Sequence, residues 1–149
     1  MSLQSDLMEA MKAAMKAKDQ TTLTALRAVK SAIILAKTES GASEELTKEQ
    51  ELKILQKQVK QRKDSAAIFL EQGREDLAAP ELAEAEVISQ FLPEALSEEE
   101  IKKIVISTIQ KVGADGIKDM GKVMGIVSKE LTGKADGKTI STIVKTQLS

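Results

Sequence analysis

Aliphatic side chains recur at spacings of three and four residues along almost the whole chain, and this period constrains the fold more than any other feature. Such spacings place side chains on one face of an α-helix. The period predicts seven helices, at about residues 3–17, 21–38, 48–72, 74–92, 98–112, 117–131 and 137–148. Eight Gly and two Pro are few for a turn-rich β chain. We therefore predict an all-α fold: an N-terminal helical hairpin with buttressing helices, followed by a compact C-terminal three-helix module.

The long hairpin is predicted from the signals at the ends of its helices. Thr47 to Gln50 has the sequence of a capping box, in which the Thr hydroxyl and the Gln side chain each satisfy a free backbone N–H. Gly73 is placed to end that helix, and Ser40 to Ser43 has the composition of a loop before it. Helices joined by a short loop usually pair antiparallel, so residues 21–72 are expected to form the hairpin.

A domain boundary is predicted near the middle of the chain. Pro93 disfavours helical geometry in the residue before it, and a second capping-box sequence, Ser97 to Glu100, follows directly. These signals predict an N-terminal helical domain at 1–92 and a three-helix module at 97–149.

The composition excludes most catalytic chemistry. The chain has no His, Cys, Trp or Tyr and only two Phe, so His or Cys nucleophile pairs and His or Cys zinc sites are not available. We expect no catalytic residues, no metal site and no cofactor. The core must be built from aliphatic side chains.

No membrane segment is expected. The longest apolar run, Ala32 to Ala36, is far shorter than the ~20 residues that a spanning helix needs. Asp6 and Glu9 lie where a signal peptide would be basic and then apolar, so the expected location is the cytoplasm.

The near-zero net charge of −1 hides a polarised chain. Residues 48–63 are mainly basic, and they contain the basic stripe, which we define as Lys53, Lys57, Lys60 and Arg62. Residues 71–100 hold Arg74 as the single basic residue among many acids. A basic stripe on a helix is a candidate phosphate-binding surface, although a solvated helix face, or a face matched to the acidic stretch that follows, is the more common explanation.

Two further features each have two interpretations. Arg62 occupies a position where the helical seam requires an apolar residue, so it either faces a functional cleft or lies along apolar surface with its head paired to a carboxylate. The second interpretation is the more common.

The first helix carries a Met-rich stripe, which is either a pliable binding surface or, more commonly, a core face. Its members are Leu3, Leu7, Met8, Met11, Ala14 and Met15.

The segment Gly133 to Thr139 resembles a phosphate loop but is one residue too short and follows a helix, so a helix-helix turn is expected. The helix that it opens, with Lys134 and Lys138, still offers a place for one phosphate. Single-stranded nucleic acid usually stacks on aromatic rings, of which this chain has only two. An RNA partner would therefore be a folded or double-stranded RNA held by its phosphates, and no DNA is expected.

A set of motifs, in order from the second helix to the C-terminus, resembles the YqeY family. These motifs are Leu26-Arg27, Gln61 to Ser65, Gly73-Arg74 with Asp76-Leu77, Phe91-Leu92-Pro93, Asp119 to Gly125 and Gly133 to Gly137. The last module is also similar to the tail domain of GatB, a subunit of the glutamine-dependent amidotransferase that acts on misacylated tRNA. The positions that carry this second likeness are Gly121, Lys122, Met124, Gly133, Lys134, Ala135 and Asp136.

The resemblance implies a function. The tail domain of GatB is associated with tRNA binding, whereas glutamine hydrolysis, the kinase step and transamidation belong to other parts of that enzyme. A family association with carbon–nitrogen ligase activity, glutamine being the amido donor, would thus describe relatives of this module. The expected function is a non-catalytic tRNA-binding or accessory protein, with a possible protein partner in tRNA amidation or translation. The candidate nucleic-acid-binding residues are Lys122, Lys134, Lys138 and Lys145. The alternative is a protein-interaction adaptor that binds no RNA.

Overall fold

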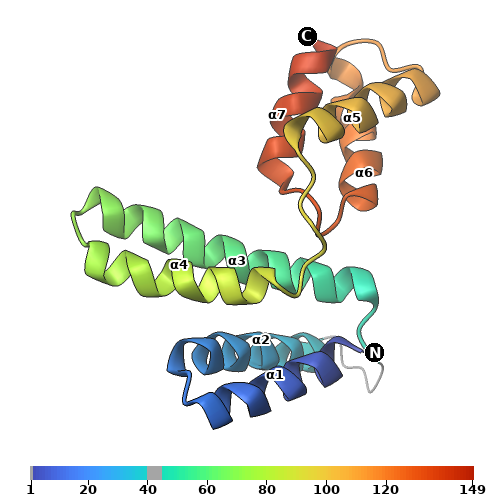
Figure 1. The fold of residues 1–149 in the computed structure, drawn as a ribbon. Coiled ribbons are helices and arrows are strands. Elements are labelled where there is room, and N and C mark those ends of the chain that lie inside the picture. The colour runs from blue at the N-terminus through green and yellow to red at the C-terminus, as the bar shows by residue number, and fades with distance from the viewer. Residues whose placement is uncertain (1, 40–44) are drawn as a thin grey trace. The chain divides into compact units, whose positions relative to one another are not determined.

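A computed structural model describes residues 2–39 and 45–149, and within these ranges it contains α-helices, one short 3-10 helix and no strand. The predicted all-α class is confirmed. The helices are α1 (Leu3–Ala17), α2 (Gln20–Glu39), α3 (Lys48–Glu71), α4 (Glu75–Ser89), α5 (Glu98–Val112), η1 (Ile117–Asp119), α6 (Met120–Glu130) and α7 (Gly137–Leu148). They divide into two compact units, Met1–Leu92 and Pro93–Ser149 (Figure 1). The loop predicted at Ser40 to Ser43 lies outside the described residues.

The first unit begins with a tight antiparallel pair, α1 and α2 (Figure 1). Lys18 ends α1 in the left-handed conformation, with φ of 56°. Asp19 then begins α2, because its carboxylate accepts hydrogen bonds from the Thr22 backbone N–H at 3.1 Å and from the Thr22 hydroxyl at 2.6 Å. Two residues are therefore enough to reverse the chain.

The second pair is the long hairpin of α3 and α4. The predicted capping box at Thr47 and Gln50 begins α3, with both reciprocal hydrogen bonds present. Gly73 adopts a φ of +71° after the end of α3, and the Arg74 backbone N–H reaches back to the Phe69 carbonyl at 2.7 Å. Figure 1 shows α4 returning along α3.

The prediction that residues 21–72 form the hairpin, with α2 as the partner of α3, was therefore wrong. The hairpin pairs α3 with α4, whereas α2 packs mainly on α1 and α4. The reason lies in the connections. The turn between α3 and α4 is short and holds a left-handed glycine, so α4 must return directly along α3. The connection between α2 and α3 is longer and spans residues 40–47.

The core of the first unit is aliphatic and centres on α2. Its buried members are Leu7, Ala25, Leu26, Val29, Ile33, Leu55, Val59, Ala85 and Ile88. The expected core face of α1 is only partly correct, because Leu7 and Ala14 are buried whereas Met8 and Met15 are each 58% exposed. Since α1 packs mainly on α2, only a narrow stripe is covered and the two Met side chains lie outside it.

The second unit packs α5, α6 and α7 against one another around its own core. The buried core residues are Ile101, Val105, Val123, Val127, Leu131, Ile140, Val144 and Leu148. Ser97 caps α5 by accepting the Glu100 backbone N–H at 3.2 Å, and Asp136 caps α7 by accepting that of Thr139 at 2.6 Å. In a full capping box the Glu100 carboxylate would accept the Ser97 backbone N–H. Here it accepts a hydrogen bond from the Ser97 hydroxyl instead. No helix among residues 2–39 and 45–149 is long and apolar enough to cross a bilayer.

Candidate nucleic-acid interface

The basic stripe of the first unit is largely neutralised by neighbouring carboxylates. Lys53 lies 3.3 Å from Glu49, and Lys60 lies 2.7 Å from Asp64, each one helical turn away on α3. Lys57 is exposed and has no carboxylate within 4 Å among the described residues. The stripe is therefore not a row of free cations.

Arg62, the fourth member of the stripe, lies inside the α3–α4 hairpin and away from solvent. Its side chain is 13% exposed and faces Glu84 of α4, whose side chain is 15% exposed. One terminal nitrogen, Nη1, donates to the carbonyl and to the side-chain oxygen of Gln58. Burial raises the pKa of Glu84, and the positive charge of Arg62 opposes that shift. The pairing with a carboxylate, which was the more common of the two expected arrangements, is present.

The lysines of the second unit resemble Lys57 and differ from Lys53 and Lys60. All of them are exposed, and none has a carboxylate oxygen within 4 Å, whereas the ion pairs of the described residues all lie in the first unit. These nine lysines, which we call the free lysines, are Lys102, Lys103, Lys111, Lys118, Lys122, Lys129, Lys134, Lys138 and Lys145.

Most carboxylates of the second unit lie at the starts of its helices. Glu98, Glu99 and Glu100 occupy the first turn of α5, where the helix dipole favours negative charge. Asp119 accepts the Asp115 backbone N–H at 2.8 Å, and Asp136 caps α7. The helix starts of the unit are therefore acidic, whereas its lysines are exposed to solvent.

The candidate residues Lys122, Lys134, Lys138 and Lys145 are all exposed, and none of them lines either of the two grooves described below. Lys138 and Lys145 are seven residues apart on α7, which places them on one face of that helix. Lys122 lies on α6, and Lys134 lies in the turn before α7, where its carbonyl accepts the Leu96 backbone N–H at 2.9 Å. The arrangement is a charged surface and not a closed binding site.

The single-phosphate site considered at the start of α7 is already occupied by a carboxylate. Asp136 accepts the Thr139 N–H at 2.6 Å, so a phosphate at this helix end would meet a negative charge. Gly133, with φ of +83°, makes the turn before it. The segment is the helix-helix turn that its spacing predicted.

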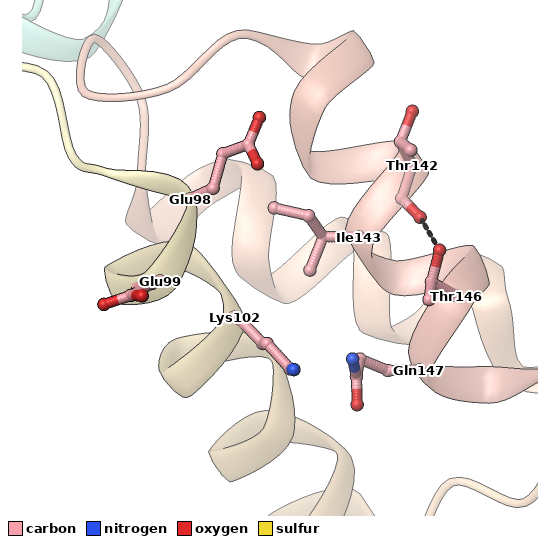
Figure 2. A pocket seen from close by; sticks show the side chains of 7 residues that line it. All are labelled: Glu98, Glu99, Lys102, Thr142, Ile143, Thr146 and Gln147. Atoms are coloured by element: carbon pink, nitrogen blue, oxygen red, sulfur yellow. Dashed lines mark hydrogen bonds between the residues drawn. The ribbon is translucent and has the colours of Figure 1, made fainter.

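One groove of the second unit lies between α5 and α7 (Figure 2). It is lined by Glu98, Glu99, Lys102, Thr142, Ile143, Thr146 and Gln147. Figure 2 shows the Lys102 amine and the Gln147 amide reaching toward one another from the facing helices, while the Thr146 hydroxyl donates to the Thr142 carbonyl at 2.9 Å. The groove combines charges of both signs with a single apolar side chain, and it is shallow.

A second groove, between α5 and α6, contains two free lysines that were not among the candidates. Lys103 and Lys111 line it together with Ser107, Thr108 and Glu130. The signal in the sequence was their spacing of eight residues, which places both on one face of α5. The charged surface of the second unit therefore extends beyond the four candidate lysines.

Comparison with known proteins relates part of this chain to a tRNA amidotransferase. One subunit of the glutamyl-tRNA(Gln) amidotransferase of Thermococcus gammatolerans is 36% identical over 73 residues, which are 46% of this chain and 12% of that protein. The chain is thus related to an amidotransferase component over part of its length, as the resemblance to the GatB tail implied.

Other relatives match over most of the chain. "Altered inheritance of mitochondria protein 41, mitochondrial" of Clavispora lusitaniae is 36% identical over 132 residues, which are 87% of this chain and 74% of that protein. The protein of the same name from Pyrenophora tritici-repentis is 32% identical over 136 residues, covering 89% and 71% of the two chains. The model of the Yqey-like protein family matches residues 4–148. Since that match spans both structural units, the protein belongs to the YqeY family.

Proposed function

We propose that this protein is a non-catalytic accessory factor that binds folded RNA of the tRNA class through the free lysines of its second unit. The observation that carries the proposal is that all nine of these lysines are exposed and, in the described part of the chain, have no carboxylate within 4 Å. In the first unit, by contrast, four basic residues are paired: Lys53, Lys60, Arg62 and Arg74. Unpaired lysines on a folded surface are available to neutralise phosphates.

The side chains of the second unit favour an RNA that is recognised by shape. The unit contains no aromatic ring on which an unpaired base could stack. Lysine amines bind phosphates as point charges, and phosphate contacts position a nucleic acid without reading its sequence. A folded RNA presents its phosphates in a fixed arrangement, so a rigid three-helix unit is suited to it.

The link to tRNA comes from the amidotransferase relative. The name of that relative refers to glutamyl-tRNA(Gln), and the matched segment is a small part of its length. The proposal therefore assigns RNA binding to this chain and assigns the amidation chemistry to other proteins. Glutaminase activity in the purified chain would contradict that division.

Binding of a tRNA transcript across a salt series tests the proposal. For the wild type, log affinity should fall with log salt concentration by up to ~0.9 for each duplex phosphate that is neutralised. The test variant replaces Lys122, Lys134, Lys138 and Lys145 by Glu, and it should lose most of the affinity and most of the salt dependence. All four side chains are exposed, so the fold should be retained.

A matched control replaces Lys53, Lys57 and Lys60 by Glu, which reverses three charges on the basic stripe. Because two of these lysines already have carboxylate partners, this variant should retain most of the tRNA affinity. Negligible binding by the wild type, or equal losses in the two variants, would contradict the proposal.

A protein-interaction adaptor is the second candidate. It is favoured by large apolar side chains that the first unit leaves exposed, among them Met8, Met15, Ile34 and Leu35. Affinity capture with the full chain after nuclease treatment distinguishes the two, because a partner held through RNA is released and a directly bound protein is retained.

A further inference from the structure

The exposed side of α1 carries apolar and basic side chains in a regular order, and Glu9 is an exposed acid on the same border as Lys16. Met8, Lys12 and Met15 are separated by four and three residues, so they lie along one face of the helix, and Lys16 borders it. Both Met side chains are 58% exposed, and both lysines are exposed without a carboxylate within 4 Å among the described residues. We call these four residues the Met/Lys stripe.

The exposed side of α4 carries the opposite charge in the same kind of order. Glu75, Ala79, Leu82 and Glu86 are separated by four, three and four residues, so they also share one helix face. All four are exposed, Leu82 by 44%, and neither glutamate has a cationic partner within 4 Å in the described part of the chain. We call these residues the Leu/Glu stripe.

We propose that the Met/Lys stripe of one molecule docks on the Leu/Glu stripe of a second copy of this chain. The two stripes match in the spacing of their apolar side chains and in the sign of their charges. A spacing of seven residues separates Met8 from Met15, about 10.5 Å along a helix, and leaves room for Leu82 between them. Lys12 and Lys16 then lie beside the apolar seam, where they reach Glu75 and Glu86.

Each copy carries one stripe of each kind, as a two-fold pair that forms the contact twice requires. This is why a second copy is favoured over an unrelated acidic helix: both halves of the contact are present on the same chain, and among residues 2–39 and 45–149 their charged groups have no ion-pair partner. The net charge of −1 opposes self-association very little. Flexible Met side chains adapt well to a partner surface.

Sedimentation of the full chain over a concentration series, at low and at high salt, tests the proposal. The wild type should show a monomer-dimer equilibrium that weakens with salt, because the flanking charges are exposed. K12E/K16E and E75K/E86K should each raise the dimer dissociation constant about tenfold or more, since like charges then face one another. An equimolar mixture of the two variants should restore association.

The apolar part of the contact is tested by M8Q/M15Q, which should also shift the wild-type equilibrium toward monomer. The matched control is K57E/K63E, which makes the same charge change on α3 and should leave the equilibrium unchanged. A wild type that stays monomeric at every concentration, or variants that associate like the wild type, would overturn the proposal. A monomeric wild type that binds a synthetic acidic amphipathic peptide would assign the stripe to a foreign helix and would also overturn it.

Discussion

The guanidinium of Arg62 and the carboxylate of Glu84 face each other across the α3–α4 hairpin, with Nε 3.9 Å from Oε1. That separation permits charge attraction but is too long for a hydrogen bond. The Nε–H is buried and has no hydrogen-bond partner in the described structure. The attraction between the two charges is therefore offset by the partial removal of both groups from water and by one donor that is left unsatisfied.

This geometry predicts strongly non-additive substitutions. Arg62→Met leaves Glu84 without its cation and should lower the free energy of unfolding by about 1–3 kcal/mol, and Glu84→Leu should do the same for Arg62. The double variant R62M/E84L removes both charges and should be close to the wild type in stability. Urea unfolding of the four proteins, analysed as a double-mutant cycle, measures the coupling. A double variant as unstable as the sum of the single variants would contradict this account.

Asp19 predicts a pH dependence of stability with a defined sign. The hydrogen bond from the Thr22 hydroxyl, and then that from the Thr22 backbone, lower the pKa of Asp19 from its ordinary value of 3.8. A carboxyl whose pKa is lowered by folding contributes stability above its unfolded pKa, and the contribution is lost as the pH falls through the folded pKa. Asp19→Asn keeps a capping side chain but cannot titrate.

The wild type should therefore be more stable than Asp19→Asn at pH 6, and the difference in unfolding midpoint should shrink as the pH falls below 3.8. Asp19→Ala, which loses the cap, should be less stable than Asp19→Asn at every pH. Chemical unfolding monitored by circular dichroism between pH 2.5 and pH 6 measures both differences. A difference between wild type and Asp19→Asn that grows toward low pH would have the wrong sign.

The helices and most of their ends could be predicted from the sequence because both are local properties. The caps at Thr47, Ser97 and Asp136 depend on residues three positions apart, and the structure contains all of them. The partner of α3 could not be predicted, because the period identifies a buried face without identifying what covers it. Exposure of Met8 and Met15 was missed for the same reason. The free lysines required the structure, since pairing depends on where each carboxylate lies.

Two glycines should respond in opposite ways to alanine. Gly73 has a φ of +71°, so Gly73→Ala should lower the free energy of unfolding by about 1–2 kcal/mol. Gly125 lies inside α6, and a Cβ there would meet no atom within 4 Å, so Gly125→Ala should raise it by about 0.5–1 kcal/mol. Urea unfolding of each variant measures the change, and effects of the same sign would contradict the prediction.

Substitutions of Asp136 should affect the stability of α7 and the affinity for RNA in different ways. Its carboxylate caps α7 between Lys134 and Lys138, so it stabilises the helix while placing a negative charge among lysines proposed to contact phosphate. Asp136→Ser keeps an N-cap and removes the charge, and it should raise tRNA affinity about fivefold, which is the effect of about 1 kcal/mol between two unit charges near 4 Å in water. Asp136→Asn is a second cap-retaining variant and should behave in the same way. Asp136→Ala should lower the stability of the second unit by about 1 kcal/mol. Filter binding at low salt and thermal unfolding measure the two effects, and an unchanged affinity in both cap-retaining variants would place the bound phosphates away from the start of α7.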